Sequence, residues 1–133
     1  MGILGTLDPF STFGGSAEAK LIFLGPPDTR WDRFRSLPIE HVSPVALRRE
    51  ISHGDDLARL RRWFFGRKPD AGFLITGFPA TLLQSRILDE WLDARHEGLD
   101  AVFAGPAAPE ALVNHYREQG LFEPFESPAR TRA

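Results

Sequence analysis

The stretch GFLITGFPATLLQ, residues 72–84, decides how this chain folds. Its first five residues, Gly72 to Thr76, form an apolar run of the length expected for one buried strand. Gly77 permits a tight turn, Phe78 supplies an apolar side chain for the core, and Pro79 fixes a backbone angle that suits the start of a helix. The stretch therefore predicts a strand that turns directly into a helix.

The same order of strand and helix continues on both sides of this stretch. Apolar runs predict further strands over residues 20–24, 39–42 and 100–104. Ser43, followed by Pro44, and Asp55 are residues that typically cap helices. The predicted helices cover residues 31–37, 44–53, 56–65, 80–96 and 109–119. Buried strands that alternate with helices favour an α/β fold of three layers, α/β/α, around a parallel sheet of about four strands.

Composition sets further limits. With 133 residues the chain suits one domain, which we place at residues 20–120 between an N-terminal extension (1–19) and a C-terminal tail (121–133). The formal net charge of −2 gives no general attraction to nucleic acid or membranes, and no cysteine is present to form disulfides or thiolate metal sites. No apolar run approaches the roughly 18 residues that span a bilayer. We expect a cytoplasmic protein without a membrane partner.

Residues 72–84 resemble the signature GF-hydrophobic-hydrophobic-DGFPRTLxQ of adenylate kinases and, more broadly, of nucleoside monophosphate kinases. Further similar segments are Gly25-Pro26-Pro27 after the first strand, His41-Val42-Ser43 with Leu47 and Arg49, and residues 99–103 with 109–113. The resemblance covers about residues 20–119. It implies a truncated P-loop-kinase-like fold with a nucleotide crevice at the carboxyl ends of the strands.

The phosphate loop of that family is replaced here. A working loop holds phosphate and magnesium through backbone N–H groups, a Lys and a Ser or Thr. The resemblance places Trp31 in the Lys position and Asp32 in the hydroxyl position. A carboxylate near the start of a helix occupies the end of the dipole that attracts phosphate. We therefore predict a degenerate phosphate loop made of Gly25, Pro26, Pro27, Asp28, Arg30, Trp31 and Asp32.

Other charged positions of the family are also changed. Thr76 stands where the resemblance implies an Asp near magnesium, Ala80 where it implies a phosphate-binding Arg, and His115 where it implies an Arg beside the lid. No segment corresponds to the lid or to a fifth strand. Phosphoryl transfer depends on positioning and charge neutralisation, and one such contact is worth about 3 kcal/mol. We therefore expect no catalytic residues, no metal and no cofactor.

Some residues of the family's nucleotide site are retained. The resemblance implies that Arg49 meets the phosphate of AMP and that Gln84 reads adenine. The predicted residual nucleotide-binding residues are Arg49, Gly77, Phe78, Pro79, Thr81 and Gln84. The alternative is that Arg49 and Gln84 are ordinary surface residues and that residues 77–79 serve packing alone.

These observations lead to three hypotheses about function. The first is a non-catalytic binding module, working as a homodimer or with a protein partner through an open sheet edge and the phenylalanines of the tails, and with a nucleotide or another anion as a ligand. The second is a working nucleoside monophosphate kinase with substitute groups such as Arg30. The third is nucleic-acid binding through the basic residues of 48–68, although at helical spacing the aromatics there are better explained as core and the arginines as a solvated face. We favour the first.

Overall fold

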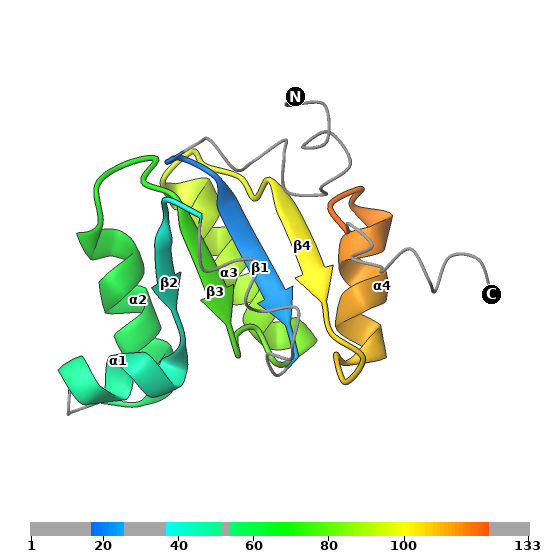
Figure 1. Ribbon diagram of the computed structural model, residues 1–133, viewed down its shortest axis with the longest axis horizontal. Helices are drawn as coiled ribbons and strands as arrows, with labels where there is room; N and C mark the ends of the chain where they lie inside the picture. Colours follow the sequence, from blue (N-terminus) through cyan, green and yellow to red (C-terminus); the bar gives the residue numbers. More distant parts are fainter. Residues whose placement is uncertain (1–16, 26–36, 52–53, 123–133) are drawn as a thin grey trace, which may run out of the picture.

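A computed structural model describes residues 17–25, 37–51 and 54–122 of the chain (Figure 1). In chain order the elements are β1 (Lys20–Leu24), β2 (Glu40–Val42), α1 (Pro44–Glu50), α2 (Asp56–Gly66), β3 (Phe73–Thr76), α3 (Leu82–Ala94), β4 (Ala101–Ala104) and α4 (Glu110–Glu118). The strands pair in parallel in the order β2-β3-β1-β4. The predicted α/β fold with a four-stranded parallel sheet is confirmed.

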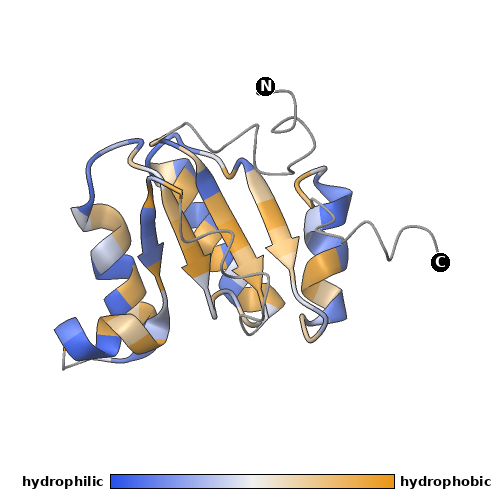
Figure 2. Ribbon diagram, viewed as in Figure 1, coloured by the Kyte–Doolittle hydropathy of each residue, from blue (hydrophilic) through white to orange (hydrophobic). Residues whose placement is uncertain are grey.

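Strand β1 lies inside the sheet, where it pairs with β3 on one side and with β4 on the other. Ile22 stands beside Ile75 of β3 and beside Val102 of β4. All residues of β1 are buried, and Figure 2 shows the inner strands as largely hydrophobic ribbons. A strand that is buried on both faces has no polar face, which is why Lys20 of β1 is followed by a continuous apolar run from Leu21 to Leu24.

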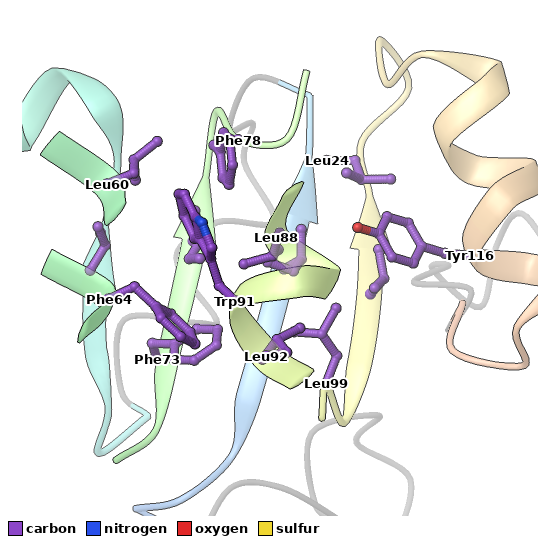
Figure 3. Close-up of a cluster of buried hydrophobic side chains, with 14 of the residues drawn as sticks. Leu24, Leu60, Phe64, Phe73, Phe78, Leu88, Trp91, Leu92, Leu99 and Tyr116 are labelled. Atoms are coloured by element: carbon purple, nitrogen blue, oxygen red, sulfur yellow. The ribbon is translucent and has the colours of Figure 1, made fainter. Parts of the chain in front are cut away.

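One face of the sheet is covered by the described helices. The close-up in Figure 3 shows Trp91 of α3 beside Phe78, with a centroid distance of 5.8 Å and an interplanar angle of 18°. Trp91 also lies 5.8 Å from the ring of Phe64 in α2. Tyr116 of α4 joins the same cluster. Burial of this apolar surface holds α2, α3 and α4 on the sheet.

The opposite face of the sheet carries a second buried cluster. Its members are Ala19, Leu21, Phe23, Leu37, Leu74, Ala101 and Phe103. No described helix contributes to this cluster. The predicted helix over residues 31–37 falls mostly on residues 26–36, outside the described part, so the third layer of the predicted fold stays a prediction.

The helix caps explain where the helices begin. Ser43 and Asp55 act as predicted, because their side chains accept hydrogen bonds from the N–H groups of Ala46 (3.1 Å) and Ala58 (2.8 Å). The predicted start of α3 at residue 80 was wrong, since Thr81 is the N-cap and Leu82 the first helical residue. Helix α1 also ends earlier than predicted, because Ile51 is already extended. None of the described helices is long and apolar enough to cross a membrane.

Described residues outside the predicted limits of 20 and 120 also make backbone contacts with the sheet. At its start, Ala17 and Ala19 accept hydrogen bonds from the N–H groups of Gly72 and Phe73. At its end, Val102 donates to the carbonyl of Leu121 (2.9 Å), and Phe122 forms a parallel bridge with Val102. These two residues lie beside β4 but form an isolated bridge and no further strand, so the predicted limits of the domain stay a prediction.

Candidate functional site

The turn between β3 and α3 lies at the carboxyl edge of the sheet. Gly77 adopts a φ of +78°, which explains why glycine stands there. Phe78 is buried and packs on Trp91, and Pro79 is also buried. These contacts agree with the alternative in which residues 77–79 serve packing.

Thr81 and Gln84 form a reciprocal cap at the start of α3. The Thr81 hydroxyl accepts a hydrogen bond from the N–H of Gln84 (3.1 Å), and the Gln84 Oε1 accepts one from the N–H of Ala80 (2.7 Å). This is a variant of the capping box, in which a Glu or Gln three residues after the cap reaches back to the backbone. The Thr-x-x-Gln spacing was a signal for this role that the sequence prediction missed.

Arg49 is exposed in the last turn of α1 and makes no hydrogen bond or ion pair with any described residue. Its neighbour Arg48 donates twice to Asp56, at 2.8 and 2.6 Å, and Arg59 donates to the same carboxylate at 2.9 Å. These hydrogen bonds hold the pKa of Asp56 well below its usual range, and the bonds from Arg48 have a larger effect than the bond from Arg59. Arg49, unlike Arg48, is therefore available to an anionic ligand.

Two cavities open at the carboxyl edge. The larger, of about 400 Å³, is lined by Ser43, Pro44, Val45, Arg48, Asp56, Thr76 and Gly77. The smaller, of about 260 Å³, is lined by Gly25, Gly77, Pro79, Ala80, Ala107 and Pro109. The charges on the described lining are those of Arg48 and Asp56, which neutralise each other. The described lining thus offers no unpaired cation to a phosphate.

We use the name apolar rim for the exposed large hydrophobic side chains at this edge. Among the described residues, the exposed large hydrophobic side chains are Val45 (55% exposed), Leu82 (38%) and Leu83 (68%). Val45 lines the larger cavity, and the two leucines begin α3 directly after the capping turn. Exposed apolar groups gathered at one place are typical of a surface that another molecule covers.

The described residues do not fit the magnesium nucleotide that the resemblance implies. The Asp of the family's metal site is replaced by the neutral, buried hydroxyl of Thr76. The carboxylate of Asp56 is already bound by two arginines. Described residues 17–25, 37–51 and 54–122 contain no group of three His, Cys, Asp or Glu side chains that could hold a metal ion. Hard divalent cations need several oxygen ligands, which this edge does not assemble.

Of the predicted degenerate phosphate loop, only Gly25 lies among the described residues. Its φ is +83°, and a Cβ placed there would lie 3.0 Å from the backbone nitrogen of Ala108. The loop after β4 therefore packs directly against the end of β1. Pro26, Pro27, Asp28, Arg30, Trp31 and Asp32 lie outside the described residues.

The basic residues of segment 48–68 were predicted to form one solvated face, and this prediction was wrong. Arg67 is buried and pairs with Glu97, their side chains being 5% and 1% exposed. Its guanidinium carbon lies 4.3 Å from the ring centroid of Phe64, in position for a cation–π contact. Arg59 is buried as well, and Arg48 is paired with Asp56. This pairing reduces the positive charge that a nucleic acid would meet.

His115, predicted at the position of a lid arginine, packs between α3 and α4. Its Nε2 lies 3.8 Å from an Oδ2 of Asp89 and 2.8 Å from the Nε2 of Gln119. Its ring meets that of Tyr116 edge-on at 4.9 Å. These contacts give His115 a structural role.

Comparison with known proteins finds three adenylate kinases that are similar to this chain. The chain is 33% identical over 120 residues to an adenylate kinase of Moorella thermoacetica, a match that covers 71% of this chain and 55% of that protein. An adenylate kinase of Corynebacterium urealyticum is 29% identical over 139 aligned positions (85% of this chain, 77% of that protein). One of Mycolicibacterium vanbaalenii is 36% identical over 62 residues (47% and 34%).

No protein-family model matches the chain. The chain also spans only about half the length of the Moorella enzyme. The match nevertheless covers 71% of this chain at 33% identity. On these grounds, the chain belongs to the adenylate kinase family.

Proposed function

We propose that this chain is a catalytically degenerate adenylate-kinase-like protein that acts as a binding module. The observation that carries the proposal is the carboxyl edge, whose described lining has no unpaired cation and whose rim is apolar. Transfer of a phosphoryl group needs cations placed around the charge that develops. Ala80 and Thr76 supply neither a cation nor a carboxylate at this edge.

The proposed ligands follow from the apolar rim of this edge and from Arg49 and Gln84, which lie outside the lining of the two cavities. Arg49 can meet the phosphate of a nucleoside monophosphate or another anion, because no described residue occupies it. Gln84 is a weaker candidate, since its Oε1 already caps α3. The apolar rim suits a protein partner or a second copy of the chain. We therefore propose weak anion binding at Arg49 and protein association at the rim.

A titration and an assay test the proposal together. The full chain is titrated calorimetrically with AMP, ADP and ATP, and it is also assayed for ADP formation from ATP with each nucleoside monophosphate. We expect AMP to bind without measurable phosphoryl transfer, and Arg49→Ala to weaken AMP binding about tenfold, as for the loss of one charge-assisted hydrogen bond.

Arg86→Ala is the matched control, because Arg86 is an exposed arginine of α3. Its affinity for AMP should equal that of the unmodified chain. Turnover that Arg49→Ala abolishes would contradict the proposal and establish the chain as a working kinase. The absence of AMP binding would exclude the anion site and leave association at the rim.

A further inference from the structure

A third cavity lies outside the carboxyl edge, beside the outer strand β2. Its volume is about 420 Å³, and its lining is Glu40, Leu47, Glu50, Ile51, Arg62, Trp63, Gly66 and Arg67. It is bounded by β2, the end of α1 and the second half of α2, and it shares no lining residue with the other two cavities. We call it the β2 cavity. Its volume lies within the range of small-molecule sites.

Two buried N–H donors belong to the lining of the β2 cavity. The indole Nε1 of Trp63 and the Nε of Arg67 are both buried and have no hydrogen-bond partner among the described residues. The remaining nitrogens of Arg67 are engaged, with the carbonyl of Ala71 at 2.8 Å and with Glu97. Burial of a donor without an acceptor is unfavourable, so a ligand that brings an acceptor oxygen is favoured here.

The charges of the β2 cavity are of both signs. Glu40, Glu50 and Arg62 are exposed, and none of them pairs with another described residue. Arg67 is neutralised by Glu97. The carboxylates of Glu40 and Glu50 would repel a phosphate or another simple anion. A simple cation would be repelled by Arg62 and would bring no acceptor for the N–H donors. A ligand that carries both charges satisfies all of these groups.

The rest of the lining is apolar. Leu47 is buried, Ile51 is partly buried, and the indole of Trp63 packs edge-on against Phe73 at 5.5 Å. Such a wall suits an aliphatic or aromatic side chain rather than a polar one.

From these groups we propose that the β2 cavity binds a zwitterion of amino-acid size with an apolar side chain. The carboxylate accepts a hydrogen bond from the indole N–H of Trp63 and is attracted by Arg62. The ammonium group is held by Glu40 and Glu50. The side chain packs on Leu47 and Ile51. This site is independent of the proposed function at the carboxyl edge.

Nuclear magnetic resonance of the full chain tests the proposal. The probes are L-phenylalanine and L-leucine, compared with 3-phenylpropionate, which lacks the ammonium group, and 2-phenylethylamine, which lacks the carboxylate. We expect the indole N–H signal of Trp63 to shift on saturation with either amino acid. Each one-charge analogue should bind at least about fivefold more weakly, as for one lost polar contact.

Variants test whether residues of the β2 cavity bind the ligand. Trp63→Phe keeps an aromatic ring and removes the donor, and Glu50→Gln removes one carboxylate; each should weaken L-phenylalanine binding about fivefold. Glu90→Gln, an exposed residue of α3, should change nothing. The proposal is overturned if the Trp63 indole signal of the unmodified chain does not move with either amino acid. It is equally overturned if phenylpropionate or phenylethylamine binds as tightly as L-phenylalanine.

Discussion

Gln84 illustrates how a residue can match a family motif and yet hold a local structural role. Its Oε1 accepts the N–H of Ala80, and its own N–H is accepted by Thr81. The bond from the Gln84 N–H satisfies a backbone donor that the first turn of a helix leaves without a partner, and the bond from Ala80 ties the residue before the cap to the helix. The helix cap therefore explains why a glutamine stands at this position, and nucleotide binding is not needed to explain it.

Replacing either capping side chain should destabilise the protein. We expect Thr81→Ala to lower the free energy of unfolding by about 1 kcal/mol, because the hydroxyl that caps α3 is lost. Gln84→Ala should lower it by about 0.5–1 kcal/mol, the usual net contribution of one hydrogen bond. Urea denaturation followed by circular dichroism measures both changes.

Gln84→Glu is the control, since Glu also serves in capping boxes. It should keep the stability of the unmodified chain. A loss in Gln84→Glu equal to that in Gln84→Ala would show that Oε1 does not act as the acceptor.

At the scale of elements, strands were easier to predict than contacts between helices. The apolar runs of β1 and β3 indicated buried strands directly, and Asp55 and Ser43 marked helix starts through their own chemistry. The pairing of Arg67 with Glu97 could not be predicted, because the two residues are 30 positions apart and meet only when α2 and α3 pack. Arg67 carries no local mark that distinguishes it from an exposed arginine.

Contacts between distant segments also limited what could be predicted about the candidate site. Gly77 and Phe78 could be placed at a turn from their sequence, because glycine and proline constrain the backbone locally. The cavities could not be predicted, since their walls come from segments as distant as Gly25 and Pro109.

The Arg67–Glu97 pair should make stability depend on pH. Burial alone would raise the pKa of Glu97, but hydrogen bonds from Arg67 and from the N–H of Asp70, with the charges of Arg67 and Lys20, outweigh burial and hold this pKa below its usual value. A lowered pKa in the folded state stabilises the fold above the unfolded pKa of about 4.3. That stabilisation is lost as the pH falls through the lower, folded pKa.

We therefore expect the free energy of unfolding to decline below about pH 4.3, and to decline less in Glu97→Gln. Arg67→Met should lower stability at neutral pH by about 3 kcal/mol, because it leaves a buried carboxylate without its partner. Arg67→Met combined with Glu97→Gln should recover part of that loss. Urea titrations between pH 3 and pH 7 check these expectations; an unchanged pH profile in Glu97→Gln would contradict them.

At the scale of the whole molecule, the carboxyl end of the sheet holds two of the cavities and the exposed large hydrophobic side chains. The opposite end holds the paired charges of Lys20, Asp70, Arg67 and Glu97. Such a division gives the protein one end suited to association and one end that ties its elements together.

We expect the chain to self-associate through the apolar rim. Sedimentation at concentrations from about 1 to about 100 micromolar should show a rise in mass with concentration, as mass action requires. Leu83→Ser should reduce this association, because Leu83 is the most exposed of the rim's large hydrophobic residues. Arg86→Ser, on the same helix, should leave it unchanged. A monomer at every concentration would exclude self-association through the rim.

Gly77 belongs to the lining of both cavities at the carboxyl edge. The two cavities are therefore neighbours separated by one backbone position, and an occupant of both has two connected parts. One part meets the uncharged lining between Gly25 and Ala80, and the other meets the Arg48–Asp56 ion pair. Connecting two weak contacts in this way raises their combined affinity without any new interaction, provided that the link spans the gap. A ligand that occupied both cavities would therefore be selected by the spacing between its two parts as well as by the chemistry of each part.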